Sequence, residues 1–460
     1  MWKFLQRNGY VLLKWMIYLG PLALLAGLID YRFHNYFWGA LNVLRPIQPI
    51  HMFDFWSVLD FYYVALVVLY GINVLFLRTI QFTKKWEWAS IPIILILAGV
   101  FVADHFFVPI EPQIKTFWWQ IAANYFAPIA FFGIMITSLR TEKSIQNFKK
   151  YLLLTFSLFG IVCLIEYFTN IFPGDNVNFL GSFEWPYIDP FFGLKAESAN
   201  WLAYLFAPMM LLSVLEFYTQ FKADSLKFKI KNIHYVLAFI ICGTILFLTK
   251  SYTGMGIAFA LLAYFVFMNL PTGKKIIALI LLVLLGAVGI ATQYNTPKFQ
   301  ILLGHYKIEN SLERRIQIYE FNANAITERT VEGIGPGNYQ SYFRSHMLEF
   351  IGITIPEEEI PPHPHNLLIY FWSDLGIFGF LALFFIYLRT LWGIFIERLK
   401  NPYFLLLAYP LGHGLLDTPY GLEEISLLFW IIVGLCSVPV IFSAKPSTPF
   451  GPPPTGPREK

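Results

Sequence analysis

The chain has 460 residues, of which 57% are hydrophobic, 19% are aromatic and only 13% are charged. Soluble domains usually carry about 25% charged residues, so this composition excludes an ordinary soluble protein. The net charge of +4 is too small to indicate nucleic-acid binding. All three cysteines lie within apolar runs, so neither a disulfide nor a cysteine metal site is predicted.

The apolar residues are gathered into runs of about 20, the length at which an α-helix crosses the hydrocarbon core of a bilayer. The sequence therefore predicts an all-α, polytopic membrane protein with about twelve transmembrane helices. In chain order, the predicted spans are residues 11–29, 55–77, 88–107, 117–139, 151–172, 198–219, 233–249, 254–270, 276–291, 366–388, 402–416 and 424–442. The first run lacks a small-residue cleavage site, so it is predicted to be a retained span and not a signal peptide.

The distribution of Lys and Arg predicts how these spans are oriented. With the N-terminus in the cytoplasm, most of the 33 Lys and Arg residues fall in inner loops or at the two termini. Both termini are then cytoplasmic, and the long hydrophilic interval between the ninth and tenth spans is external. The chain is thus divided into spans at 1–291, an external loop at 292–365, spans at 366–445 and a disordered Pro- and Gly-rich cytoplasmic tail at 446–460.

Three carboxylates lie inside predicted spans, namely Asp60, Glu166 and Asp374, and each falls in the outer half of its span. Charges at such depth usually face a bundle interior or a water-filled cavity. Two interpretations therefore stay open, an outward-facing cavity or local pairing.

The external loop begins with a pattern that is typical of a helix N-terminus. Asn310 and Glu313 have the spacing of a capping box, which puts Arg314 and Arg315 in the first turns of the helix. A helix N-terminus favours anions, and the guanidinium fork matches two phosphate oxygens, so this is a candidate phosphate site. The alternative is a solvated helix face on which the arginines pair with Glu313 and Glu320.

A glycine-rich turn follows at Gly333-Ile-Gly-Pro-Gly337. It fits neither the dinucleotide-binding pattern nor the P-loop pattern. Either a phosphate cradle or a simple reversal between two amphipathic helices would account for it.

The loop ends in Pro361-Pro-His-Pro-His-Asn366. Three prolines are expected to hold the backbone extended up to the next span, which places His365 at the membrane–water interface with Asn366 as a helix cap. A neutral imidazole there can accept a proton, so His365 is a candidate general base. The alternatives are a structural interface histidine and a metal pair of His363 with His365. No further ligand cluster is visible near this pair in the sequence, so no metal site is predicted.

Seven motifs occur in a fixed order and spacing along the chain. They are Glu197-Ser-Ala-Asn200-Trp-Leu-Ala203, Arg315-x-x-x-Tyr319, Gly333-x-Gly-Pro-Gly337-Asn-Tyr, His365-Asn366-x-Leu, Gly376-x-x-Gly379, Gly412-His-Gly-Leu-Leu-Asp417-Thr-Pro419 and Leu428-Phe-Trp430. Taken together, these motifs resemble the bacterial O-antigen ligase/polymerase superfamily. The resemblance covers about residues 195–440. The family commonly has an Arg at the position of Tyr252, and here Lys250 could supply that charge as a point cation.

The resemblance implies a membrane-glycosyltransferase C-type fold that catalyses inverting, metal-independent glycosyl transfer without a cofactor. The donor would be an undecaprenyl-diphosphate-linked glycan and the acceptor a saccharide or lipid-linked glycan, at the outer face of the cytoplasmic (inner) membrane. In this interpretation His365 takes the acceptor proton, and Arg315 holds the diphosphate together with Lys250 and Arg314. The remaining substrate-binding candidates are Tyr319, Asn200 and Asn366.

Other functions remain open at this point. A repeat-unit polymerase of the same superfamily would use the same chemistry. A lipid-linked glycan transporter or a non-catalytic scaffold belongs to another functional class. The sequence shows no internal repeat and no paired charges near the bilayer midplane, which argues against the transporter.

Overall fold

The structure is a computed structural model that describes residues 2–26, 58–76, 87–106, 114–169, 199–223, 232–295, 300, 311–356, 360–397 and 401–437. Within these ranges every regular element is a helix, in agreement with the predicted fold class. The predicted tail at 446–460 lies outside the described residues.

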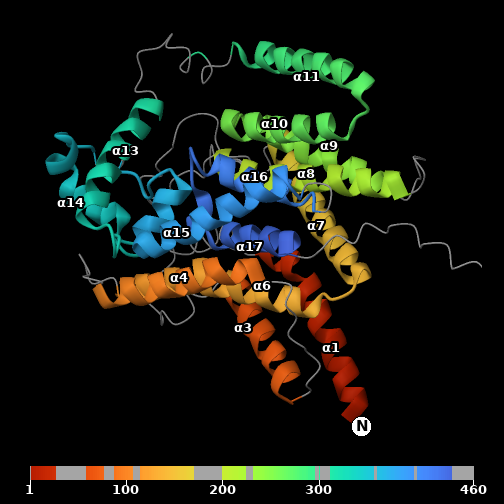
Figure 1. Cartoon of the computed structure of the whole chain (residues 1–460), viewed down its shortest axis with the longest axis horizontal. Helices are drawn as coiled ribbons and strands as arrows, with labels where there is room; N and C mark the ends of the chain where they lie inside the picture. Colours follow the sequence, from red (N-terminus) through yellow and green to blue (C-terminus); the bar gives the residue numbers. More distant parts are fainter. Residues whose placement is uncertain are drawn as a thin grey trace, which may run out of the picture.

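The predicted apolar spans correspond to helices of the structure, shown in Figure 1. Their bounds are α1 Trp2–Tyr18, α3 Val58–Gly71, α4 Glu87–Phe106, α5 Ile114–Ile121, α6 Ala127–Ser138, α7 Glu142–Thr169, α8 Ala199–Ala223, α9 Ile233–Leu248, α10 Tyr252–Asn269, α11 Thr272–Gln293, α15 Leu367–Phe395, α16 Phe404–His413 and α17 Glu423–Ser437. Short π-helical turns at Ile72–Phe76 and Ala122–Phe126 extend α3 and join α5 to α6.

Among the described residues, seven helices are long and apolar enough to cross a membrane, or eight if the bent pair Gln6–Tyr18 and Gly20–Ala26 forms one span. Leu59–Leu75, Ile233–Leu248 and Phe404–His413 are shorter apolar helices. The chain is therefore built as a polytopic membrane protein, while the count of twelve stays a prediction.

The surface of α11 indicates the environment that surrounds the bundle. Large apolar side chains of α11 are exposed along its length, including Ile276, Val283 and Val288. Soluble proteins rarely expose such a continuous apolar surface, so it is suited to lipid.

The bundle core holds the helices that carry the site. Here α8 packs against α9, α15 against α4, and α16 against α8, while α17 packs against α6. These helices lie side by side in Figure 1, and α13 (Ser311–Glu328) and α14 (Tyr339–Ile351) lie together at one end of them.

The helices α13 and α14 have a small aromatic core of their own. Phe321 of α13 lies with its ring centroid 4.2 Å from that of Phe343 of α14. Trp372 of α15 belongs to the same buried cluster, and its indole N–H donates to the carbonyl of Thr330 at 3.3 Å. The pair is thus fastened to the bundle through α15.

The glycine-rich turn docks into a break in α15. The N–H groups of Ile334 and Gly335 both donate to the carbonyl of Ser373, at 2.7 and 2.8 Å, and the N–H of Ile377 donates to the carbonyl of Val331 at 3.2 Å. At the break, Gly376 has φ 61° and ψ −153°, a backbone region that only glycine readily adopts. Because two N–H groups of the turn are already used, the turn acts as the reversal between α13 and α14, and the phosphate cradle is not supported.

Charged side chains inside the bundle have polar partners. Asp374 is buried and accepts a hydrogen bond from the Tyr125 hydroxyl at 2.9 Å, so local pairing explains this carboxylate. Lys149 falls between the predicted spans 117–139 and 151–172, but in the structure it belongs to α7 and forms a buried ion pair with Glu216 of α8 at 2.5 Å. The side chain of Glu166 lies outside the described part of the chain.

Candidate active site

The candidate site is centred on two residues that are far apart in the sequence. The Nδ1 atom of His365, just before α15, lies 2.9 Å from Oδ1 of Asp417, in the loop after α16. The His365 side chain is 26% exposed and that of Asp417 is 7% exposed. The imidazole is therefore reachable from outside while its carboxylate partner is shielded.

The backbone around His365 differs in one respect from the predicted extended run. His365 itself has φ 51°, in the left-handed region. This backbone conformation costs a non-glycine residue about 1–3 kcal/mol and persists only where the surrounding structure holds it. The next residue, Asn366, caps α15 as predicted, because its side-chain oxygen accepts from the N–H groups of Leu368 and Ile369. The chain therefore turns sharply at His365 before entering the helix.

Contacts from two other segments hold this turn in place. The Tyr319 hydroxyl of α13 lies 3.2 Å from the carbonyl oxygens of both His365 and Leu415. The Asn366 amide also donates to the Leu415 carbonyl, at 3.0 Å, and the N–H of Leu367 donates to the Gly414 carbonyl. These contacts fix the loops that carry His365 and Asp417 relative to one another.

A chain of hydrogen bonds continues on the far side of Asp417. The Asn200 amide nitrogen, at the start of α8, donates to Oδ2 of Asp417. The Asn200 oxygen accepts from the hydroxyl of Ser251 at 2.6 Å, and Ser251 is the N-cap of α10. The N–H of Thr418 donates to Oδ1 of Asp417 at 2.8 Å. Each donor in this chain meets an acceptor, so the carboxylate is held in one orientation.

The charge state of Asp417 follows from these neighbours. Burial raises the pKa of its carboxyl group, but the hydrogen bond from His365 and the charges of His365, His363 and His413 outweigh burial and hold the pKa well below its usual range. An ionised carboxylate can only accept hydrogen bonds, so Nδ1 of His365 is the donor to Asp417; when the imidazole is neutral, its lone pair is on Nε2.

The predicted cations lie on neighbouring segments. Arg315 is one turn before Tyr319 on α13; burial raises the pKa of the Tyr319 hydroxyl, and the charge of Arg315 opposes that rise. Arg314 donates to Gln317 of its own helix at 3.4 Å. Lys250, with φ 50°, directly precedes Ser251 of the hydrogen-bond chain. The predicted cap Asn310 lies outside the described residues.

The structure thus brings Asn200, Tyr319, His365 and Asn366 together around the Asp417 loop, with Lys250 next in sequence to one member of the chain. Two members of the network, Asp417 and Ser251, were not among the predicted site residues. Asp417 stood within a motif that carried the family resemblance, but nothing in the sequence indicated its partner.

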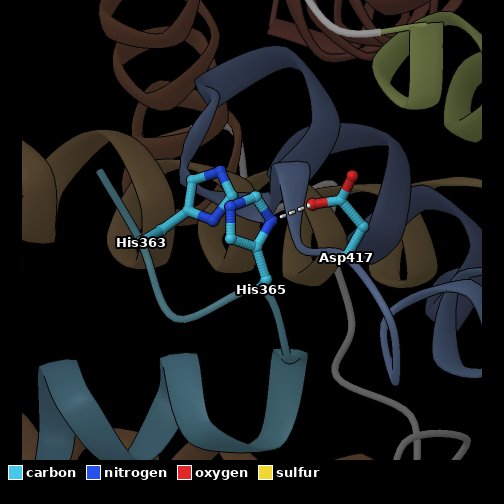
Figure 2. A group of neighbouring side chains, drawn as sticks. All are labelled: His363, His365 and Asp417. Atoms are coloured by element: carbon cyan, nitrogen blue, oxygen red, sulfur yellow. Dashed lines mark hydrogen bonds and ion pairs between the residues drawn. The ribbon is translucent and has the colours of Figure 1, made fainter. Parts of the chain in front are cut away.

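The same cluster bears on the expectation about metals, which stays a prediction. His363 lies beside His365, with ring centroids 4.5 Å apart, and Figure 2 shows the His365 ring between His363 and Asp417. One ligand atom from each of the three residues lies within 4.8 Å of the others. The expectation of no metal site rested on the lack of a third ligand near the two histidines in the sequence, and Asp417 is a third candidate ligand in the fold.

Residues 237–384 match the family described as O-antigen ligase, a stretch that includes Lys250, Arg315 and His365 but ends before Asp417. No curated protein matches the chain. The family match confirms the resemblance to the O-antigen ligase/polymerase superfamily over residues 237–384.

Proposed function

We propose that the protein transfers a glycan from an undecaprenyl-diphosphate-linked donor to an acceptor hydroxyl. The observation that carries this proposal is the pairing of His365, which lies in the stretch that matches the O-antigen ligase family, with Asp417, which lies beyond that stretch. A partly exposed imidazole with a buried, ionised partner is an arrangement that suits general-base catalysis.

In the proposed reaction, Nε2 of His365 accepts the proton of the acceptor hydroxyl as its oxygen attacks the anomeric carbon of the donor. The bond from that carbon to the diphosphate oxygen breaks, and the diphosphate leaves with the bonding electrons. Asp417 stabilises the imidazolium that forms and keeps the proton of the neutral ring on Nδ1, as in other histidine–carboxylate pairs.

The leaving diphosphate gains negative charge, and stabilising such charge is often the largest catalytic contribution. Arg315 is the residue proposed to do this, assisted by Lys250 and Arg314. The contact of Tyr319 with the His365 carbonyl supports this role, because Arg315 lies one turn away on the same helix.

The proposal includes a topology. Twelve spans with both termini in the cytoplasm would place α13, α14 and His365 at the outer face of the cytoplasmic membrane, where the donor would be presented. The excess of Lys and Arg in the inner loops supports this orientation. Reporter fusions near Lys143 and Lys307 that faced the same side would contradict it.

The test is turnover of a lipid-linked donor by purified variants in vesicles. A general base typically contributes about 10²–10⁴ in rate, so His365→Ala should lose activity on that order while still binding donor. His363→Ala should lose much less, and a chelator should leave turnover of the wild-type chain unchanged. Full activity of His365→Ala would reject the base assignment.

A ligase and a polymerase form the same kind of bond, so the acceptor is what distinguishes them. Transfer to a glycolipid acceptor yields one product per acceptor, whereas transfer to another repeat unit yields a ladder of lengths. A transporter or a scaffold would form no covalent product in the same vesicles.

A further inference from the structure

We propose that His363, His365 and Asp417 form a binding site for a Zn²⁺-type transition-metal ion, and that an ion bound there blocks His365 as a base. The binding itself is independent of the proposed function, while the inhibition rests on it. The observation is the convergence of two imidazoles and a carboxylate at one partly exposed point.

The geometry of the three residues is close to that of a three-ligand site. Zn²⁺ binds imidazole nitrogen and carboxylate oxygen at about 2.0–2.2 Å, so neighbouring ligand atoms of a tetrahedral site lie roughly 3.4 Å apart. The three ligand atoms here already lie within 4.8 Å of one another. His365 and Asp417, at 2.9 Å, must move slightly apart, and His363 must move closer.

The backbone of this segment is restricted before an ion is bound. Pro361, Pro362 and Pro364 restrict φ around the two histidines, so little chain entropy is lost when an ion is bound. The Asp417 carboxylate is also held by Asn200 and by the Thr418 N–H. Three protein ligands leave one tetrahedral position open, and solvent can reach this site because the His365 side chain is partly exposed.

The ligand set selects the class of ion. Imidazole is a preferred ligand of Zn²⁺, Cu²⁺ and Ni²⁺, whereas Mg²⁺ and Ca²⁺ prefer oxygen ligands. Two imidazoles with a single carboxylate therefore fit Zn²⁺ and not Mg²⁺.

Metal binding and base catalysis compete for the same imidazole. A neutral ring has one N–H and one lone pair. When Nδ1 donates its proton to Asp417, the lone pair is on Nε2 and can accept the acceptor proton. When Nδ1 binds a metal ion, the ring proton is on Nε2, which can then no longer act as a base.

The binding test uses the full chain without a polyhistidine tag in nanodiscs, with Zn²⁺ as the probe and Mg²⁺ as the comparison ion. The wild-type chain should bind one Zn²⁺ in competition with a chromophoric chelator, and it should bind no Mg²⁺ at this site. His363→Gln and Asp417→Asn should each weaken Zn²⁺ binding by at least about tenfold, because even outer partners of metal ligands contribute that much.

The matched control is His346→Gln, which removes a half-buried histidine of α14 that lies outside the cluster. It should bind Zn²⁺ like the wild-type chain. Absence of Zn²⁺ binding, or binding that neither His363→Gln nor Asp417→Asn weakens, would overturn the site.

The inhibition test measures transfer with and without Zn²⁺, each variant being normalised to its own rate without the ion. Zn²⁺ should abolish transfer by the wild-type chain, a chelator should restore it, and His363→Gln should need at least about tenfold more Zn²⁺ for the same inhibition. Bound Zn²⁺ that leaves transfer unaffected would overturn the competition. If no transfer occurs without Zn²⁺, the proposed function fails, and the binding measurement alone decides the zinc site.

Discussion

The side-chain amide of Asn200 donates to Oδ2 of Asp417 and so turns the other carboxylate oxygen toward His365. Since the Asn200 oxygen accepts from Ser251, the amide cannot rotate without losing both hydrogen bonds. A residue at the start of α8 thereby orients a carboxylate in the loop after α16, and through it the candidate base.

Asn200→Asp tests this relationship with almost no change in shape. A second carboxylate would face Asp417, and like charges raise the pKa of one member of such a pair. In the wild-type chain the pKa of Asp417 is held below its usual range, so the carboxylate stays ionised at neutral pH. In the variant, one carboxyl of this pair has a raised pKa and becomes protonated at a higher pH than Asp417 does in the wild-type chain. The acid side of the pH–rate profile should therefore move to higher pH.

The measurement is turnover as a function of pH for Asn200→Asp, with Ser251→Ala as the comparison. Ser251→Ala removes the hydrogen bond to Asn200 and the one that the Gly254 N–H donates to the Ser251 hydroxyl. Each is typically worth about 0.5–1.5 kcal/mol and no charge is added, so the variant should lower the rate without moving the profile. An unchanged profile in Asn200→Asp would show that Asn200 does not act on Asp417.

The helices could be predicted from the sequence because a bilayer requires a fixed length of apolar chain. His365 could also be singled out, since the prolines around it and the helix that follows are local features. The left-handed turn at His365 was missed because it depends on contacts with Tyr319 and the Asp417 loop, which come from distant segments.

The partners of the site residues could not be predicted for the same reason. Asp417 is 52 residues from His365 and 217 residues from Asn200, and no periodicity connects positions so far apart. The Lys149–Glu216 pair was missed because a lysine just outside a predicted span is assigned to a loop. Pairing within a bundle depends on which helices are neighbours, and hydropathy does not specify this.

Gly376→Ala is expected to loosen α13 and α14 from the bundle. The backbone at Gly376 lies in a region that costs other residues about 1–3 kcal/mol, and an added Cβ would lie 1.8 Å from the Val331 carbonyl oxygen. The turn would have to leave the break in α15, which exposes the loop between the two helices. Limited proteolysis should therefore cut this segment faster, and turnover should fall.

The matched control is Gly286→Ala in α11, where an added Cβ meets no atom within 4 Å. It should change neither proteolysis nor turnover. Equal protease resistance of Gly376→Ala and the wild-type chain would contradict the docking of the turn.

Lys149→Met is expected to destabilise the bundle by about 3–5 kcal/mol, because it leaves Glu216 buried without its counter-charge. The Tyr403 hydroxyl also donates to Glu216, at 2.5 Å, but a neutral donor does not replace the lysine charge. Thermal unfolding in one detergent should show a lower midpoint for Lys149→Met than for Lys150→Met, which alters an exposed lysine on the same helix.

The double variant Lys149→Met with Glu216→Leu should recover part of the loss, since replacing a whole buried ion pair by apolar residues is often close to neutral. A midpoint for the double variant below that of Lys149→Met would argue against an uncompensated charge as the cause.

Lys250→Ala is expected to raise the donor concentration needed for half-maximal turnover and to lower the maximal rate. Lys250 directly precedes Ser251 of the Asp417 network, and it stands two residues from the position at which the family commonly carries an Arg. A cation there would attract the diphosphate before reaction and stabilise it as charge develops. Tyr252→Arg should be tolerated or should increase turnover, because a guanidinium can bind two phosphate oxygens where an ammonium acts as a point charge.

The measurement is initial rate against donor concentration for both variants, with Lys275→Ala, at the start of α11, as a control that removes a lysine elsewhere. Unchanged kinetics in Lys250→Ala would show that this end of α10 does not contact the diphosphate.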